Sequence, residues 1–360
     1  MSPLAHLLRR EIESRGPITF ARFMELALYH PGWGYYERPA TAVGRAGDYY
    51  TSVSVGPLFG ELLGFRFARW LAALPGGRVC LVEGGAHDGR LAADVLGFFE
   101  AHEPALADRL EYWLLEPSAR RRTRQAEVLQ GFGGRVRWAG GWEELPRVRG
   151  VVFSNELLDA LPVRRLLWQR SEGVWREAGV ACAGDEFVWA RMPGDPARLA
   201  PGLPPDLLAV LPDGFAIEVG TMAVEWWRGA AAALEAGWLL TIDYGDAPGE
   251  RFQPGRGGGT LRAYRSHRAS FEVLADPGAQ DLTAHVDFGA VLSAGEAGGL
   301  KTEGLWRQEQ FLGDILREVE AGGGSFPGWT PARLRQCRTL LHPAHLGSSF
   351  KVLVHSSGIG

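Results

Sequence analysis

The sequence is poor in several residue types, and each shortage argues against a class of protein. The three cysteines, Cys80, Cys182 and Cys337, lie far apart and form no CxxC pair, which argues against a disulfide framework, a zinc site or a redox motif. No stretch approaches the roughly 20 apolar residues that a membrane-spanning helix needs, and charges interrupt every apolar run at the N-terminus. We therefore expect a cytoplasmic protein without membrane insertion or a bound metal.

Charge and asparagine are also limited. Lysine occurs only at positions 301 and 351, so nearly all positive charge comes from arginines that Asp and Glu balance to a net charge of -4. Because no basic stripe forms, we expect no nucleic-acid partner. The chain contains a single asparagine, Asn155, in the segment FSNELLDALP. In a chain with so strong a compositional bias, which resembles that of a GC-rich genome, an isolated asparagine is a candidate functional residue.

The order of apolar segments predicts the fold. With 360 residues, the chain exceeds the usual size of a single core, so we expect two lobes or one large domain with an appendage. From about residue 78, nearly continuous apolar strands alternate with helical stretches, which is typical of a parallel sheet covered on both faces. We predict a doubly wound α/β core formed by residues 77–162 and 213–360.

Two further segments lie outside this core. Residues 1–76 form an N-terminal segment with helical periodicity at 4–15 and 18–29, followed by an aromatic, glycine-rich loop. Residues 163–212 alternate apolar and polar positions around two turn signals, which predicts an inserted β meander. Later helices are expected at 307–321 and 331–341, and a last strand in SSFKVLVHSS.

In an open parallel sheet, ligands bind beyond the carboxyl ends of the strands. The first core strand ends at Glu83, and Gly85 and Gly89 follow in a turn without the GxGxxG spacing of NAD-binding proteins. The second ends at Glu116, where a carboxylate could accept hydrogen bonds from ribose hydroxyls. This pattern indicates a nucleoside cofactor. The alternative is that the two glycines allow helix packing and that Glu116 is an ordinary charge at a strand end.

Two more strand ends carry candidate catalytic groups. If a helix begins at Asn155 or Glu156, the spacing places Glu156 and Asp159 on one face, where paired carboxylates could grip a cationic substrate. The alternative is that Asn155 caps this helix and that both carboxylates favour its first turn. A strand over 281–287 would place His285 beside acidic residues, where an orienting or core role is favoured over metal binding.

Ordered motifs then identify a family that the chain resembles. GPITFARFMELALYHPGWGYY, GDYYTS, VEGGAHDG, NELLDALPV, IDYGD, GTLRAY, DLTAHVDF and SSFKVLV occur in the order typical of MidA-type methyltransferases, which depend on S-adenosylmethionine (SAM). The resemblance runs from about residue 16 to 354. It implies a Rossmann-like class I SAM methyltransferase sheet with added helical and β segments.

The resemblance also implies roles for individual residues. The residues that match its SAM-binding motifs are Gly47, Asp48, Thr51, Ser52, Glu83, Gly85, Gly89, Glu116 and Asn155. The chain departs from the family pattern ExGPGxG at two positions, where Ala86 replaces the proline and His87 replaces a glycine. His87 places a side chain where the backbone of the family passes close to the cofactor.

The activity implied is methyl transfer to an arginine of a partner protein, by analogy a respiratory complex I subunit. Such an in-line displacement depends mainly on positioning of the nucleophile. We expect Glu156 and Asp159 to align the guanidinium and His285 or Asp48 to assist. The alternative is a SAM-binding assembly factor with weak or no catalysis, for which His87 is the main argument. An NAD-dependent oxidoreductase is disfavoured by the missing GxGxxG turn. The oligomeric state stays open, with a homodimer as one option.

Overall fold

The computed structural model describes residues 2–38, 51–265, 268–322 and 326–359. The chain forms two units, each assembled from three segments. The first unit comprises Met1–Tyr49, Asp159–Val224 and Asp246–Gly289, and the second unit comprises Tyr50–Leu158, Glu225–Gly245 and Ala290–Gly360. Two predicted site residues, Gly47 and Asp48, lie outside the described residues.

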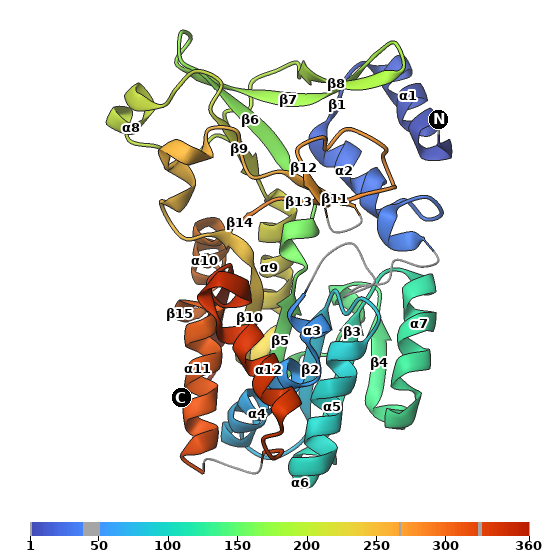
Figure 1. Ribbon diagram of the computed structural model, residues 1–360, viewed down its shortest axis with the longest axis vertical. Coiled ribbons are helices and arrows are strands. Elements are labelled where there is room, and N and C mark those ends of the chain that lie inside the picture. Colours follow the sequence, from blue (N-terminus) through green and yellow to red (C-terminus); the bar gives the residue numbers. More distant parts are fainter. Residues whose placement is uncertain (1, 39–50, 266–267, 323–325, 360) are drawn as a thin grey trace. The chain divides into compact units, whose positions relative to one another are not determined.

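The second unit contains the predicted parallel sheet (Figure 1). Its strands lie in the order β15-β16-β10-β5-β2-β3-β4. Strands β4, β3, β2, β5 and β10 are mutually parallel, while β16 is antiparallel to both β10 and β15. The strands are β2 Val79–Gly84, β3 Leu110–Leu115, β4 Val136–Ala139, β5 Val148–Asn155, β10 Leu234–Asp246, β15 Lys301–Arg307 and β16 Phe350–Ser357. The α/β fold expected from the sequence is confirmed.

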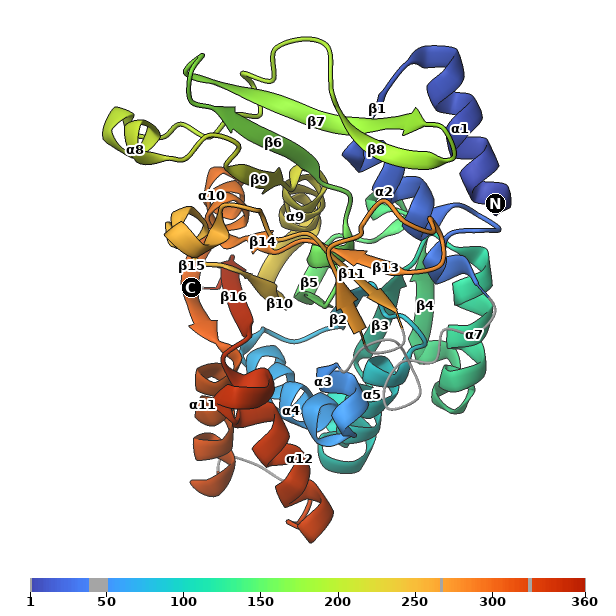
Figure 2. The ribbon, with the colours of Figure 1, turned by 45° about the horizontal axis from the view of Figure 1, so that its top comes forward.

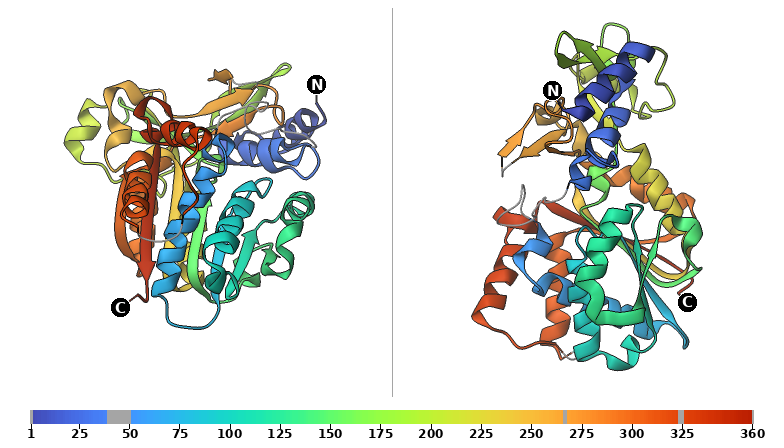
Figure 3. Two further views of the ribbon diagram at one scale, coloured as in Figure 1. Left: turned by 60° about the horizontal axis from the view of Figure 1, so that its bottom comes forward. Right: turned by 90° about the vertical axis from the view of Figure 1, so that its right-hand side faces the viewer.

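Helices cover both faces of this sheet (Figure 3, right). Alternate residues of β16 point to opposite faces: Val352 and Val354 join the large apolar core, while His355 contacts Trp227 of α9 and lies against Gly295 of α10. The helices that contribute to the unit are α3 Ser52–Val55, α4 Leu58–Ala73, α5 Arg90–His102, α6 Pro104–Ala107, α7 Ala119–Leu129, α9 Thr221–Ala233, α10 Phe288–Ala297, α11 Gln308–Glu320 and α12 Pro331–Leu341.

The large core on one face explains why these segments are helical. In α4, α5 and α11 the buried apolar residues recur every three or four positions, as in Leu91, Val95 and Phe98 of α5. Phe67 of α4 contacts Phe153 of β5 with a centroid separation of 4.9 Å. The strands therefore present an apolar layer that these helices bury.

The first unit has antiparallel architecture (Figure 2). One sheet has the order β1-β7-β6-β9, with β8 paired to β7, and a second has the order β12-β11-β13. The elements are α1 Pro3–Arg15, β1 Ile18–Thr19, α2 Phe20–Tyr29, β6 Arg164–Gln169, β7 Val174–Ala183, β8 Glu186–Arg191, α8 Pro205–Val210, β9 Ala216–Val219, β11 Arg262–Arg265, β12 Arg268–Ser270, β13 Asp281–Thr283 and β14 Val286–Asp287. Apolar residues of α1 and α2 form its core.

Several boundaries differ from the sequence-based expectation. The continuous strand expected over 281–287 is wrong, because β13 ends at Thr283 and β14 begins at Val286. The meander falls in the same unit as α1 and α2, whereas α3 and α4 belong to the second unit. Short helical turns complete the chain: η1 Tyr35–Glu37, η2 Gln130–Arg135, η3 Trp142–Glu144, η4 Leu158–Ala160, η5 Glu250–Phe252, η6 Pro254–Arg256 and η7 Pro343–Gly347.

Candidate functional site

The glycine turn after β2 has the backbone conformation that glycine permits. Gly85 has φ +72° and Gly89, which precedes α5, has φ +88°. A Cβ atom at Gly85 would lie 2.8 Å from the Leu157 side chain, so a larger residue there would have to displace Leu157. The turn therefore keeps an open backbone at the N-terminus of α5, where amide groups can face a ligand.

His87 adopts φ +47° within this turn, a conformation that is costly for a residue with a Cβ atom. The departure from the family's glycine thus falls at a left-handed position. The His87 carbonyl accepts a hydrogen bond of 3.1 Å from Gln125 Nε2, which anchors the turn to α7.

Glu116 follows β3 and is 1% exposed. Its carboxylate accepts hydrogen bonds from the Ser118 N–H at 2.9 Å and from Gln125 Nε2 at 3.1 Å, and it pairs with Arg121 Nε at 3.2 Å. If a ribose bound here, its hydroxyl groups would replace some of these protein groups as hydrogen-bond donors to Glu116. Gln125, which the sequence analysis did not single out, links Glu116 to the glycine turn; its position in the middle of a charged helix gave no signal.

Glu83 lies inside the sheet rather than at its surface. Its carboxyl group accepts a 2.6 Å hydrogen bond from the Tyr112 hydroxyl, and the residue is 2% exposed. Burial raises the pKa of Glu83 to about 8, although the Tyr112 hydrogen bond opposes the shift. Glu83 therefore holds the ends of β2 and β3 together beneath the glycine turn.

Asn155 is the last residue of β5 and does not cap a helix. Its Nδ2 donates to Glu156 Oε1 at 3.1 Å, and its buried Oδ1 has no hydrogen-bond partner among the described residues. The helix expected from residue 155 or 156 is replaced by the short turn η4. Asp243 accepts hydrogen bonds from the N–H groups of Leu157 and Leu158, at 3.2 and 2.8 Å, at the start of that turn. The capping role considered for Asn155 belongs to Asp243.

Glu156 has φ +53°, and its Oε1 also accepts a hydrogen bond of 3.3 Å from the Ser52 N–H. Ser52 is fully buried and donates through Oγ to Gln308 Oε1 at 3.1 Å, while Thr51 caps α3. The structure therefore brings together three predicted residues, Ser52, Asn155 and Glu156, within the second unit. Because Asn155 Oδ1 has no partner among the described residues, it is suited to accept a hydrogen bond from a ligand.

Asp159 and His285, the other two predicted catalytic residues, belong to the first unit. The Ala284 N–H donates to the Asp159 carbonyl at 2.9 Å, so the residue before His285 is tied to Asp159. Burial, and next the Asp159 charge, raise the pKa of Tyr264. The chain thus brings Asp159, Tyr264 and the segment leading to His285 into one neighbourhood.

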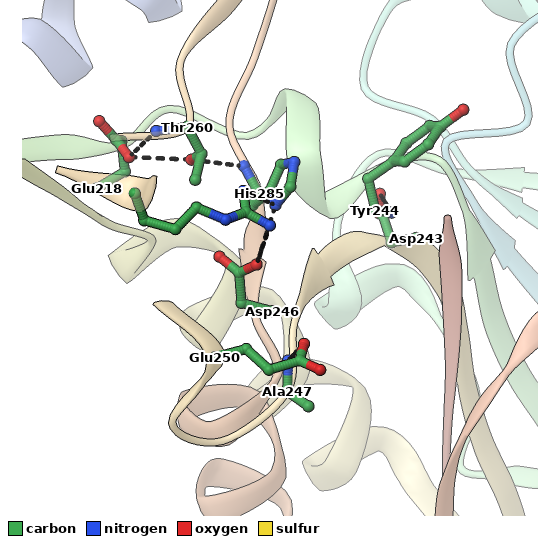
Figure 4. Close-up of polar contacts among 9 residues, drawn as sticks. Glu218, Asp243, Tyr244, Asp246, Ala247, Glu250, Thr260 and His285 are labelled. Atoms are coloured by element: carbon green, nitrogen blue, oxygen red, sulfur yellow. Dashed lines mark hydrogen bonds and ion pairs between the residues drawn. The ribbon is translucent and has the colours of Figure 1, made fainter. Parts of the chain in front are cut away.

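Polar side chains surround His285 (Figure 4). Its Nδ1 lies 3.2 Å from Asp246 Oδ1 and 3.2 Å from Arg256 Nη1, and its backbone N–H donates to Thr260 Oγ1 at 3.0 Å. Burial raises the pKa of Asp246, but the neighbouring His285 and then Arg256 outweigh it, so that the net pKa is lowered. Asp246 is therefore a carboxylate at neutral pH.

Glu218 anchors this cluster and was not singled out from the sequence. It is 4% exposed and accepts hydrogen bonds at Oε2 from the N–H of Thr260, at 2.8 Å, and from its hydroxyl, at 2.9 Å. Together with Arg251 and Asp287, which form an ion pair, these groups line a cavity of about 10 Å³. That volume is close to the space that one water molecule requires.

The residues of the second unit fit a SAM molecule. The groups that could contact SAM are the open glycine turn before α5, the Glu116 carboxylate after β3 and the Asn155 Oδ1 atom at the end of β5. That oxygen is buried and has no partner among the described residues. Among the described residues, no group of three or more His, Cys, Asp or Glu side chains could hold a metal ion. No helix in the described part of the chain is long and apolar enough to cross a membrane.

This sheet order, with one antiparallel strand and a glycine turn after its central strand, defines a class I SAM-dependent methyltransferase. Residues 62–306 match the model of a family described as "Putative S-adenosyl-L-methionine-dependent methyltransferase". The chain belongs to this family, and SAM is its cofactor.

Known proteins resemble the whole chain. A crystal structure from Burkholderia thailandensis bound to S-adenosyl-homocysteine has 34% sequence identity and a TM-score of 0.85, over 99% of this chain and 92% of that one. The mitochondrial protein arginine methyltransferase NDUFAF7 of Danio rerio is 30% identical over 80% of this chain and 70% of its own. The Drosophila melanogaster homologue is 28% identical over 99% of this chain and 85% of its own.

Proposed function

We propose that this SAM-dependent methyltransferase transfers the methyl group to an arginine nitrogen of a partner protein. The observation that carries the proposal is the Glu156 carboxylate, which the Ser52 N–H and the Asn155 amide hold at the end of β5 beside the glycine turn. The names of the Danio rerio and Drosophila melanogaster relatives support arginine as the acceptor.

The reaction makes limited demands on the protein. A guanidinium nitrogen attacks the methyl carbon, the carbon–sulfur bond breaks, and the sulfur keeps the bonding electron pair. The acceptor nitrogen loses one proton, so the methylated guanidinium keeps a single positive charge. Carboxylates that accept hydrogen bonds from the other guanidinium nitrogens favour localisation of the positive charge there and align the attacking one.

The proposal assigns these tasks to predicted residues. Glu156 and Asp159 align the guanidinium, and His285, oriented by Asp246, accepts the proton released from the substrate nitrogen. The acceptor arginine belongs to a partner protein. By analogy with the family that the chain resembles, the first partner to test is a respiratory complex I subunit. We propose that this activity takes place in the cytoplasm.

The test has two stages. Calorimetry first measures SAM binding to the purified protein, and radiolabelled SAM then measures methyl transfer to a lysate of cells that lack this protein. Mass spectrometry of methylated peptides from cells with and without the protein identifies the acceptor. We expect methylarginine on a small number of proteins. SAM binding without transfer to any arginine would favour the assembly-factor alternative.

Variants then test the assigned residues. Glu156→Gln and Asp159→Asn should each lower kcat by about 100-fold or more, while SAM affinity stays within a factor of about three. Glu186→Gln and Asp185→Asn change the same types of group at exposed positions and should leave turnover unchanged. Full turnover in both Glu156→Gln and Asp159→Asn would rule out the assigned roles.

A further inference from the structure

Asp246 and Arg256 of the first unit both contact one ring nitrogen of His285, which lies next to Asp246 in Figure 4. Nδ1 lies 3.2 Å from Arg256 Nη1 and 3.2 Å from Asp246 Oδ1, and Arg256 Nη2 lies 3.0 Å from the same Asp246 oxygen. Each separation is within hydrogen-bond reach. The two contacts of Nδ1 differ, however, in whether they require a proton on that atom.

The two partners of Nδ1 make incompatible demands. A guanidinium only donates hydrogen bonds, and a carboxylate only accepts them. Contact with Arg256 therefore requires a lone pair on Nδ1, which in a neutral imidazole puts the proton on Nε2. Contact with Asp246 requires a proton on Nδ1, which leaves the lone pair on Nε2. One Nδ1 atom cannot satisfy Arg256 and Asp246 at the same time.

Of the two partners, Arg256 is the one that can move. The Asp246 side chain is 6% exposed at the end of β10, and the His285 backbone is fixed through Thr260 to the buried Glu218. The Arg256 side chain is 34% exposed and comes from η6, which the glycines at 257–259 follow. Three consecutive glycines leave the backbone beside Arg256 many accessible conformations.

The remaining charged groups around the ring are already engaged. Arg251 pairs with Asp287 and donates to the Glu218 carbonyl, and Glu218 accepts from Thr260. Among the described residues that line the cavity, Arg256 and Asp246 are the two charged side chains within hydrogen-bond distance of the imidazole. The position of the His285 proton therefore depends on these two residues.

We propose that Arg256 is a positioning residue that sets the tautomer of His285. While Arg256 contacts Nδ1, the proton is on Nε2, and Nε2 cannot act as a base. When Arg256 moves away, Nε2 loses its proton to water, Nδ1 gains one from water and donates it to Asp246, and Nε2 becomes a proton acceptor. The consequence for methyl transfer depends on the proposed function, whereas the tautomer does not.

Nitrogen NMR of the protein, labelled with ¹⁵N-histidine, reads the tautomer directly. Spectra are recorded at about pH 8.5, above the range in which histidine ordinarily titrates, and His285→Gln assigns the His285 signals. We expect the proton on Nε2 in the wild type and on Nδ1 in Arg256→Met. Arg256→Lys, which restores a donor, should return the proton to Nε2.

Arg251→Met is the matched control, because it removes a guanidinium from the same cavity without touching Nδ1, and it should leave the wild-type pattern. A proton on Nδ1 in the wild type, or an unchanged pattern in Arg256→Met, would overturn the inference. If Arg256→Met does not fold, Arg256→Ala provides the same comparison.

Activity gives an independent measurement. In Arg256→Met, kcat at a fixed pH of about 8.5 should be higher than in the wild type, because Nε2 carries the lone pair without a prior movement of Arg256. A switch of tautomer without any rise in kcat would support the inference on Arg256 and count against the catalytic role proposed for His285.

Discussion

The two units differ in how the chain builds them and in what holds them together. In the second unit, successive strand–helix steps place parallel strands side by side, and the apolar faces of α4, α5 and α11 cover them. In the first unit, antiparallel strands from three separate segments meet, and buried polar contacts such as that between Thr260 and Glu218 join residues 42 positions apart.

This difference separates two kinds of constraint. Backbone spacing and apolar packing dominate the second unit, so its most sensitive positions are those where strands approach closely. Hydrogen bonds to buried carboxylates dominate the polar cluster of the first unit, so its sensitive positions are donors and acceptors. Substitutions in each unit can therefore test whether the distinction holds.

The largest effect is expected at Gly150 in the middle of β5. A Cβ atom there would lie 1.9 Å from the Cys80 carbonyl oxygen of β2, so Gly150→Ala must displace a central strand. We expect a loss of about 3 kcal/mol or more in the free energy of unfolding, measured by chemical denaturation. Gly97→Ala in α5, where nothing lies within 4 Å, should instead stabilise by about 1 kcal/mol. Equal effects of the two changes would contradict the packing argument.

Glu83 gives the second unit a pH-dependent stability. Since its pKa in the folded protein is about 8, above the ordinary value of 4.5, its stabilising contribution is full below about pH 4.5 and is lost as the pH rises through 8. Glu83→Gln, which still accepts the Tyr112 hydrogen bond, should become more stable than the wild type toward pH 8, by on the order of 1.4 kcal/mol per pH unit. Thermal melts across this range measure the difference. Parallel curves for the two proteins would show that Glu83 is not held protonated.

Thr260 tests the polar cluster of the first unit. Thr260→Val removes the hydroxyl that donates to Glu218 and accepts from the His285 N–H. Because a buried carboxylate loses one donor, we expect a loss of about 1–3 kcal/mol in denaturant titrations. Thr260→Ser keeps the hydroxyl and should stay near the wild type. A Val variant as stable as the wild type would show that the hydroxyl contributes nothing to stability.

The smallest effect is expected at His87. Glycine adopts the left-handed conformation at lower cost, so His87→Gly should stabilise the second unit by about 1 kcal/mol or less. Calorimetry should also show SAM binding at least as tight as in the wild type. His87→Ala keeps the Cβ atom and should show no gain in stability. If His87→Gly binds SAM more weakly, the imidazole contributes a cofactor contact.

Much of the second unit could be predicted from the sequence, because its pattern is local. Periodic apolar residues located α11 and α12 to within one residue, at Gln308–Glu320 and Pro331–Leu341. Continuous apolar runs located the strands, and strand ends located the glycine turn. These signals are strong because each helix or strand must bury one face against a neighbour in the same unit.

The first unit was less predictable because its polar contacts join distant parts of the chain. Neither Glu218 nor Arg256 belongs to a recognisable local motif, and each obtains its role from a partner tens of residues away. The cap of η4 was misassigned for the same reason. Asn155 stands next to that turn in sequence, but Asp243 reaches it from the adjacent strand β10.

The alternation of segments has a consequence for the history of the gene. Six segments belong in turn to the first and the second unit, so the chain crosses from one unit to the other five times. Fusion of two complete genes end to end would produce a single crossing. End-to-end fusion of two complete genes therefore does not account for this arrangement. Neither unit can be cloned as one uninterrupted reading frame.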